Sequence, residues 1–277
     1  MDYKKGFKIK PKEIRKNGVV IFTDGTNDSM PNEMSCLAYG YKYEDGVCRA
    51  FIPSKITEKK QSSESTNKIG GTNTIKQSTN SQTIGKNNTI ERSANSLVVG
   101  EANEIESDSN NAVVFGKMGK ATHTGEFCIG GGGFNSEAGL LQYSVLQVSN
   151  KTTAATDVSL YIDSDDDIDK EIQLPANSVT TYEIWLSGLV TGGSSGTPGD
   201  YETYEYHGTM RTDNAGAITH NAKISRLLGR TGSLGTKSID ISVAYTLRLQ
   251  ITGQANVNTA WHAVVKLHTN KTNAVEF

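Results

Sequence analysis

The sequence predicts an all-β protein in which a short β-roll, or β-solenoid, of 14–16-residue coils precedes an antiparallel, jelly-roll-like β-sandwich. Two observations lead to this fold class. Three sequence landmarks recur in phase through the middle of the chain at a period near 15 residues, which is too short for the common helical repeats. The C-terminal half consists of strand-length segments that are rich in β-branched and aromatic residues and show no helical period.

The N-terminal part divides into a basic arm and a small module. Residues 1–17 hold seven Lys or Arg against two acidic residues, and we expect them to form a docking segment. In residues 18–60, a strand at Val19–Thr23 leads into an Asp24–Gly25 turn, and a second Asp-Gly pair follows at Asp45–Gly46. This pattern predicts a hairpin module followed by a polar linker.

The chain has three cysteines, Cys36, Cys48 and Cys128, and an odd number argues against a disulfide framework. The start of the sequence lacks a signal-peptide core, which indicates maturation in the cytoplasm. We therefore expect small buried thiols at Cys36 and Cys48. A disulfide between them is the alternative if the protein meets oxidising surroundings.

The repeat region spans residues 61–139 and is marked by three landmarks. An apolar residue followed by Gly recurs at intervals of 15, 15, 16 and 14 residues, at Ile69, Ile84, Val99, Phe115 and Ile129. Asn followed two positions later by Ile recurs at Asn73, Asn88 and Asn103. Asn before a small polar residue recurs at Asn80, Asn95 and Asn110. Because the three landmarks keep the same phase, the region is a repeat and not a linker.

Each coil is expected to contain two short strands that end at tight turns. Gly supplies the positive φ of such a turn, and Asn tolerates it next best. Stacked coils place equivalent side chains above one another, so we expect ladders of Asn. We expect the landmark apolar residues to point inward and to serve in the repeat core and in trimer packing: Ile69, Ile84, Ile90, Val99, Ile105, Phe115 and Ile129.

The run Leu97–Val99 predicts an oligomer. Consecutive apolar residues in one strand place apolar side chains on both of its faces, so both faces need burial. The coil interior takes one face, and a partner chain must take the other. Each coil also buries few apolar groups for the backbone that it orders. We therefore expect several copies to bundle around a common axis as a homotrimer.

Residues 140–277 are assigned to the β-sandwich. Six segments alternate as strands do, and in two of them the apolar residues share a face: Tyr182, Ile184 and Leu186, and Leu247, Leu249 and Ile251. The glycine-rich stretch Gly130–Phe134 predicts a flexible joint before the sandwich. The segment Thr191–Tyr206 combines Gly and Ser with Tyr201, Tyr204 and Tyr206, a composition typical of binding loops. We take these tyrosines as a candidate receptor contact; the alternative is that they pack in the sandwich core.

The sequence contains no catalytic or metal-binding motif. Signatures of a nucleophile, a phosphate-binding loop and a zinc site are missing, and His207, His220, His262 and His268 are scattered singly. We predict no catalytic residue, no metal and no cofactor. The acidic segment Asp163–Asp169 lacks the Gly and Glu of an EF-hand loop, so we expect a solvated hairpin tip, with calcium binding as the alternative. The net charge of −2 and the lack of a long apolar run argue against nucleic-acid binding and membrane insertion.

The coil sequences NSQTIG, NSLVVG and NNAVVFG resemble the NSxAIG-type coils of trimeric autotransporter adhesin heads and of bacteriophage tail fibres. The small alanines of that pattern are often Thr, Asn or Glu here. GEFCIGGG (125–132) is similar to the segment that closes such rolls. LPANSVTTYEIWLSG (174–188), YEYHGTMR (204–211) and LRLQITGQANVNTAWHAVVKLHT (247–269) resemble the terminal β-sandwich of phage tail and fibre proteins. The chain lacks the signal peptide, stalk and anchor of an autotransporter, which favours the phage proteins.

This resemblance implies a non-enzymatic bacteriophage tail fibre or virion appendage protein, homotrimeric, structural and involved in host-surface attachment. Such a protein is made in the host cytoplasm and becomes part of the virion. Its expected partners are copies of itself, other virion or tail proteins at its N-terminal region, and a host-surface glycan or protein. The alternatives are a polysaccharide-degrading tailspike and a purely structural decoration or joining protein.

Overall fold

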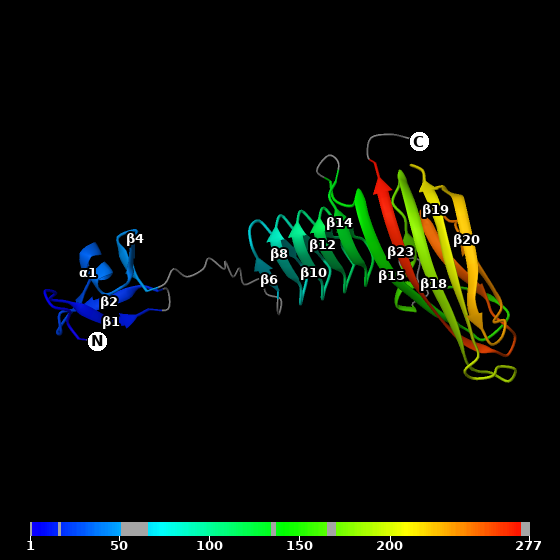
Figure 1. The fold of residues 1–277 in the computed structure, drawn as a ribbon, viewed down its shortest axis with the longest axis horizontal. Coiled ribbons are helices and arrows are strands. Elements are labelled where there is room, and N and C mark those ends of the chain that lie inside the picture. The colour runs from blue at the N-terminus through cyan, green and yellow to red at the C-terminus, as the bar shows by residue number, and fades with distance from the viewer. Residues whose placement is uncertain (1, 16–17, 51–65, 134–136, 165–169, 273–277) are drawn as a thin grey trace. The chain divides into compact units, whose positions relative to one another are not determined.

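The computed structural model describes residues 2–15, 18–50, 66–133, 137–164 and 170–272. It divides the chain into two compact units, Met1–Lys59 and Lys60–Phe277, and nearly all regular structure is β (Figure 1). The all-β prediction is confirmed. The first unit contains the predicted basic arm and hairpin module, and the second contains the predicted roll and sandwich.

The first unit contains a three-stranded antiparallel sheet, a hairpin and one short helix. Its elements are β1 (Lys10–Ile14), β2 (Val20–Thr23), β3 (Asp28–Ser29), α1 (Glu33–Ala38), β4 (Lys42–Glu44) and β5 (Val47–Arg49). Strand β1 of the basic arm pairs with β2, so the arm belongs to this fold. The sequence predicts the two hairpins but not α1, which Asn32 caps by accepting a hydrogen bond from the N–H of Ser35.

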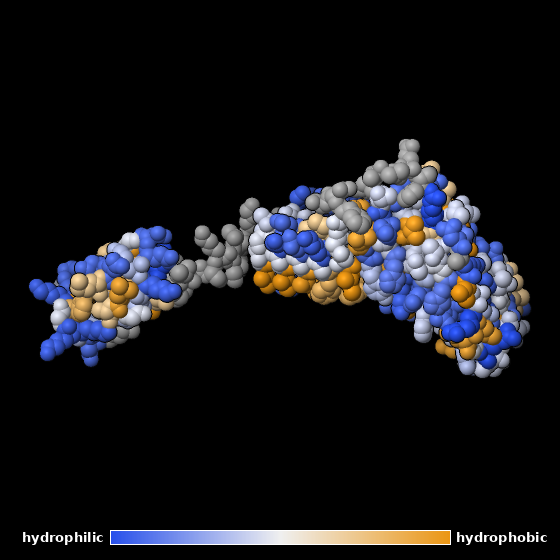
Figure 2. Space-filling model, turned by 45° about the horizontal axis from the view of Figure 1, so that its top comes forward, coloured by the Kyte–Doolittle hydropathy of each residue, from blue (hydrophilic) through white to orange (hydrophobic). Residues whose placement is uncertain are grey.

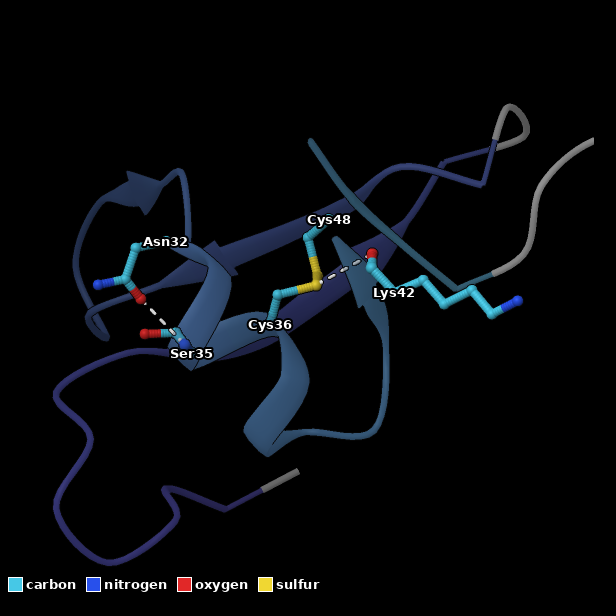
Figure 3. The surroundings of a disulfide bond; sticks show 5 residues. All are labelled: Asn32, Ser35, Cys36, Lys42 and Cys48. Atoms are coloured by element: carbon cyan, nitrogen blue, oxygen red, sulfur yellow. Dashed lines mark hydrogen bonds between the residues drawn. A yellow bond between two sulfur atoms is a disulfide. The ribbon is translucent and has the colours of Figure 1, made fainter. Parts of the chain in front are cut away.

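A disulfide joins α1 to β5 (Figure 3). Cys36 and Cys48 are both buried, with Cα atoms 5.6 Å apart, in a small core that includes Val20 and Phe22. The expectation of two free thiols is therefore wrong, and the alternative holds. The unpredicted helix brings Cys36 against the strand that carries Cys48. A core of this size gains from a covalent link because it buries little apolar surface.

The roll consists of stacked coils that form two parallel sheets. One strand of each coil lies in a long sheet: β6 (Asn67–Ile69), β8 (Gln82–Lys86), β10 (Leu97–Glu101), β12 (Val113–Lys117) and β14 (Phe127–Gly131). The second strand lies in a four-stranded sheet: β7 (Thr74–Lys76), β9 (Thr89–Glu91), β11 (Glu104–Ile105) and β13 (Lys120–Ala121). Equivalent residues pair, so that Val99 lies between Ile84 and Phe115. The predicted β-solenoid is confirmed.

Apolar stacking and an asparagine ladder hold the coils together. The interior contains the fully buried Ile75, Ile90, Ile105, Val98, Val114 and Cys128. The Asn88 side-chain oxygen accepts hydrogen bonds from the backbone and side-chain N–H groups of Asn103, and its amide donates to the carbonyl of Gly100. Asn73 relates to Asn88 in the same way. The predicted Asn ladder is confirmed at these positions.

The long sheet continues from the roll into the sandwich (Figure 1). After β14 it contains, in spatial order, β15 (Leu141–Thr152), β23 (Asn258–Lys271), β18 (Ser178–Gly192), β19 (Tyr201–Thr212) and β20 (Ile218–Arg230). The facing layer contains β16 (Asp157–Ser159), the 3₁₀ turn η1 (Ile162–Ser164), β17 (Ile172–Gln173), β21 (Thr236–Asp240) and β22 (Thr246–Thr252). The core between the layers includes both predicted apolar faces, those of β18 and β22. The predicted antiparallel sheets are confirmed.

Two of the four glycines expected to form a joint, Gly130 and Gly131, lie inside the long sheet, and the other two follow β14. Gly130 belongs to β14 and pairs with Gly116 on one side and Gln142 on the other. A Cβ at Gly130 would lie 2.2 Å from the backbone nitrogen of Gly119. Gly130 therefore permits close packing within the sheet, which corrects the expectation of flexibility for the start of this stretch; Phe134 lies outside the described residues.

Candidate functional site

One side of the long sheet, which we call the outer face, carries a row of apolar side chains along the roll. The row follows the pairing of the coils through Ile69, Ile84, Val99, Phe115 and Ile129. A second row contains Leu97, Val113 and Phe127. Ile69 and Ile129 are 47% and 42% exposed. Figure 2 shows apolar residues gathered along one side of the roll.

The seven predicted packing residues separate into two groups. Ile90 and Ile105 are fully buried in the coil interior. The other five, those followed by Gly, lie on the outer face, which corrects the expectation that they point inward. Val98 fills the interior of its coil, so its neighbours Leu97 and Val99 must point outward. Packing of the outer face against a partner chain stays a prediction.

The outer face changes character where it crosses the sandwich. From Phe127 the pairing leads through Val145, Lys266, Glu183, His207 and Ile224. Its charged groups are paired within the chain. The Lys266 ammonium is 3.1 Å from the Glu183 carboxylate and lies 5.7 Å from the ring centroid of Trp185, which is 51% exposed.

Glu205, the neighbour of Trp185 on β19, forms a second charged group on the outer face. Its carboxylate accepts hydrogen bonds from His207 and Arg226. These bonds, with that from His207 the stronger influence, hold the pKa of the Glu205 carboxyl below its ordinary value. The charged side chains on this part of the outer face thus neutralise one another within the chain, and the exposed indole of Trp185 lies among them.

The three predicted receptor-contact tyrosines lie on β19 and not in a loop. Tyr206 is buried in the sandwich core, and burial raises the pKa of its hydroxyl to about 12. Tyr204 stacks on Tyr206 with ring centroids 6.0 Å apart, and its hydroxyl donates to buried Glu202. Tyr201 is 41% exposed. The odd spacing along the strand turns Tyr201 away from the other two, so the three side chains do not share one face; a receptor contact at these tyrosines stays a prediction.

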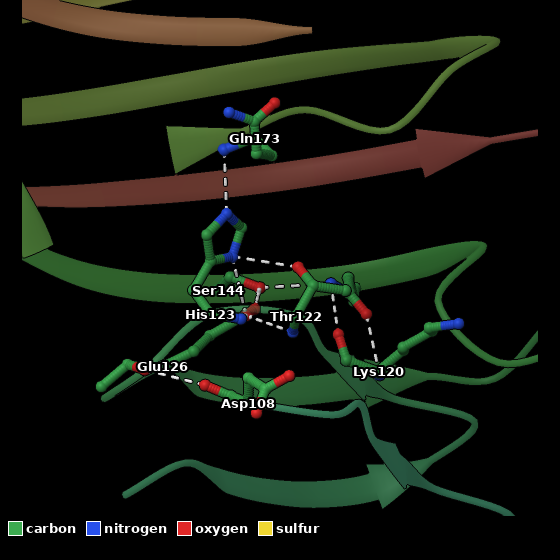
Figure 4. A network of polar contacts seen from close by, with 9 residues as sticks. Asp108, Lys120, Thr122, His123, Glu126, Ser144 and Gln173 are labelled. Carbon is green, nitrogen blue, oxygen red and sulfur yellow. Dashed lines mark hydrogen bonds and ion pairs between the residues drawn. The ribbon is translucent and has the colours of Figure 1, made fainter. Parts of the chain in front are cut away.

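A cavity of about 390 Å³ lies where the last coil of the roll meets the sandwich. Its lining includes Glu106, Lys120, His123, Gln142 and Lys271. Glu126 is 2% exposed and is the centre of a polar network beside the cavity (Figure 4). Its carboxylate accepts from the backbone N–H groups of Thr122 and His123, from the His123 ring and from the Ser144 hydroxyl.

The network holds the His123 ring between two partners. Its Nε2 atom accepts a hydrogen bond from the N–H of Gln173 at 2.8 Å, and its Nδ1 atom faces the Glu126 carboxylate at 3.1 Å. Burial raises the pKa of the Glu126 carboxyl, but the bonds from His123, Ser144 and Thr122 outweigh burial and leave the pKa below its ordinary value. Glu126 thus joins the last coil to β15, and His123 joins it to β17.

This arrangement is structural in character. Cleavage of a glycosidic bond needs a carboxyl group that keeps its proton near neutral pH, and Glu126 does not. The other carboxylate of the cavity, Glu106, is paired with Lys120. Glu126 is therefore not suited to donate that proton. The sequence does not reveal this network, because His123 and Glu126 match no motif and Gln173 is distant in the chain.

Among the residues that the structure describes, no three His, Cys, Asp or Glu side chains are grouped as metal ligands would be. The calcium alternative concerns Asp163–Asp169, of which residues 165–169 lie outside the described part. Within the described ranges, no helix has the length and apolar character to cross a membrane.

No family model and no curated protein sequence matches the chain. Its fold is distantly similar to three solved structures. The tailspike of Acinetobacter phage vB_ApiP_P1 has 10% identity and a TM-score of 0.25, with 74% of this chain and 49% of that chain covered. The Acinetobacter baumannii phage AM24 tailspike has 8% identity and a TM-score of 0.28, covering 76% and 50%. The tailspike of A. baumannii phage Fri1, described as a capsular polysaccharide depolymerase, has 10% identity and a TM-score of 0.28, covering 71% and 42%. This chain spans half the length of those proteins or less, and a likeness of this size establishes neither a family nor an activity.

Proposed function

We propose that this chain is a non-enzymatic structural protein of a bacteriophage tail fibre or related virion appendage, which forms a homotrimer and contributes to host-surface attachment. The resemblance of the coils and C-terminal strands to phage fibre sequences supports the phage assignment. The apolar row on the outer face of the roll supports the assembly. The expected location is the virion, after synthesis in the host cytoplasm.

The row has the properties of a surface that is buried in an assembly. Contiguous apolar patches of more than a few hundred Å² are rare on the surfaces of monomeric proteins. This row runs over five neighbouring strands, and because the coils pair in register, the row follows the rod. Parallel rods can bury such rows against one another around a common axis, and three copies close the arrangement.

Attachment to a host would use the sandwich. Its β18–β19 connection is rich in Gly and Ser, and Ser194, Ser195 and Thr197 are exposed there beside Tyr201. Three copies held together present three such sites at once, and linked sites can exceed the affinity of one by about 10²–10⁴-fold. We expect a host glycan or protein as the ligand.

The solution mass of the full chain tests the assembly. We expect the native protein to have three times the mass of one chain by light scattering. Val99→Asp places a charge in the centre of the apolar row, and we expect this variant to dissociate because a buried unpaired carboxylate is costly. Thr89→Asp places the same charge on the opposite sheet of the same rod and should remain a trimer. A native monomer contradicts the proposal.

Two assays separate the remaining roles. Labelled full-length protein should bind host cells, and binding to none of a broad panel of strains would favour a decoration or joining protein. Incubation with host polysaccharide should release no new reducing ends. Release of such ends would contradict the non-enzymatic assignment and favour a degrading tailspike.

A further inference from the structure

Strand β20 is the outermost strand of the long sheet, and much of it is covered on neither side. Its apolar residues Ile224, Leu228 and Leu227 are 66%, 44% and 40% exposed. In the described part of the chain it pairs with β19 alone. The sandwich core includes Tyr206 and Met210 of β19, whereas β20 reaches this core through Ile218 near its start. The strand therefore overhangs the smaller sheet.

The pairing shows that the overhang exposes an apolar side chain on each of its sides. Ile224 lies opposite His207 and is on the outer face. Leu227 lies opposite Tyr204, whose ring is on the core side of β19. Trp185 and Leu189 of β18, at 51% and 49% exposure, share the outer face. One chain alone leaves all of these groups in water.

The free edge of β20 is poorly suited to adding another strand. Register shifts interrupt its pairing with β19 at Thr203/Tyr204 and at Thr209/Met210. Bulges and charged side chains are common protections of edge strands against pairing with other chains, and Lys223 and Arg226 lie in the exposed middle of β20. The surfaces that need a partner are therefore the two faces of the strand and not its backbone edge.

We infer that β20 is a clasp strand that a second copy of this chain covers in the assembled trimer. This inference rests on the proposed homotrimer and extends its interface from the roll to the far edge of the sandwich. The outer side of β20 lies on the same face of the long sheet as the apolar row of the roll, and the neutralised polar part of the sandwich lies between them. In a closed ring of three copies, one surface of each copy contacts a different surface of the next copy. The two sides of β20, which expose Ile224 and Leu227, offer two such different surfaces.

The charges of the outer face favour a copy of the chain over an ionic partner. Glu183 is paired with Lys266, and Glu205 with His207 and Arg226, within one chain. A partner therefore meets a face that is already neutralised, and burial of such a face does not require new ion pairs. Trp185 in its centre is the kind of residue that dominates interface energies.

Thiol labelling of the trimer tests the clasp. Cys36 and Cys48 are joined and Cys128 is buried, so Ile224→Cys introduces the one accessible thiol of the described residues. In the native assembly we expect it to react with a maleimide on the order of tenfold more slowly than Ser194→Cys, an exposed control in the β18–β19 loop, because reaction requires opening of the contact. In the dissociated Val99→Asp background the two thiols should react at similar rates.

The labelling rates test whether β20 is covered in the trimer, and the solution mass tests whether the trimer forms. A trimer in which Ile224→Cys reacts as fast as Ser194→Cys overturns the clasp, keeps the trimer and leaves β20 open to a different protein. A native monomer overturns both, and the solution mass shows it. As a second measurement, Ile224→Asp should raise the dissociation concentration of the trimer at least about tenfold. Thr219→Asp on the same strand should leave it nearly unchanged; equal effects would contradict the clasp.

Discussion

At the residue scale, glycine sets how closely the coils stack. Gly100 has a φ of +132°, in the region that L-residues with a side chain rarely adopt. A Cβ at this position would lie 1.9 Å from the carbonyl oxygen of Gly116 in the next coil. Two separate constraints, on conformation and on space, therefore act on one residue.

Gly100→Ala is expected to destabilise the roll by about 3 kcal/mol or more, because it adds backbone strain to a steric overlap. Urea unfolding followed by circular dichroism measures the change. Gly71→Ala is the matched control, since a Cβ at Gly71 meets nothing within 4 Å and its φ is not in the strained range. Equal losses in the two variants would contradict this account of the stacking.

Glu126 makes the junction sensitive to acid. Its pKa in the folded protein lies below the 4.5 that is ordinary for the group, so folding favours the ionised form. The stability that this preference contributes is present above pH 4.5 and is lost as the pH falls toward the lower folded value. The pKa of the Glu126 carboxyl is lowered because His123, Ser144 and Thr122 donate hydrogen bonds to the ionised carboxylate.

Glu126→Gln is expected to lower the free energy of unfolding at pH 7 by about 1–3 kcal/mol, because one amide cannot accept all of the donors that face it. As the pH falls below 4.5, the variant should lose less stability than the native protein does. Glu137→Gln, a surface carboxylate that pairs loosely with Lys271 at 3.9 Å, serves as the control. Parallel pH profiles for Glu126→Gln and the native protein would show that Glu126 does not supply the acid sensitivity.

The sequence predicts the contacts of single residues where those residues recur at equivalent positions of the repeat. The ladder of Asn73, Asn88 and Asn103 follows from their common phase. The network of Glu126 does not, because its contacts join segments that are distant in the chain. The Cys36–Cys48 disulfide depends on α1, a helix of six residues that is too short to show a helical period, so the odd number of cysteines alone favours the wrong state.

At the element scale, the coil is the unit that can be added or removed. Gln82 and Leu97 are equivalent and paired, so residues 82–96 constitute one complete coil. Each coil contacts mainly its neighbours, as in other solenoids. A deletion that preserves the phase should therefore leave every remaining strand with an equivalent partner.

Deletion of residues 82–96 is expected to give a folded protein in which β6 pairs with β10. Its rod should be shorter by about 4.8 Å, the spacing of neighbouring strands. Circular dichroism and small-angle scattering measure folding and length. Deletion of residues 82–88 alone places β9 where a strand of the long sheet belongs and should abolish the roll; a folded product from that deletion would refute the coil as the unit.

The sequence predicts element type well and element orientation less well. In LVVG all three apolar residues suit an interior, so the pattern does not say that Val98 points in and Val99 points out. Strand β20 escapes prediction for a related reason: exposed on both sides, it lacks the apolar–polar alternation of a half-buried strand. Its weak pattern is itself a consequence of the overhang.

At the scale of the whole molecule, the chain has two units with different means of stabilisation. The first relies on a disulfide across a small core, and the second on stacked coils and a large sandwich core. The disulfide closes a loop between residues 12 positions apart in the sequence, and a link over such a loop contributes about 3 kcal/mol to the free energy of unfolding. The loss of that link should therefore affect one unit alone.

Reduction of the disulfide is expected to make residues 1–50 sensitive to trypsin while the unit from Lys60 onward stays resistant. Mass spectrometry of the fragments identifies the cleaved segment. The double variant Cys36→Ser/Cys48→Ser should behave like the reduced protein and should not respond to reductant. An N-terminal unit that resists trypsin equally in both states would show that its small core suffices.

The unbroken long sheet gives the molecule a mechanical property. At the junction, four residue pairs between β14 and β15 join the sandwich to the roll, together with the contacts of Glu126 and His123. Tension along the stack pulls these backbone bonds nearly along their N–H···O direction, and the ladder shares the force instead of opening from one end. Torque applied to the sandwich is therefore transmitted to the coils, so a force on the sandwich acts on the roll as well.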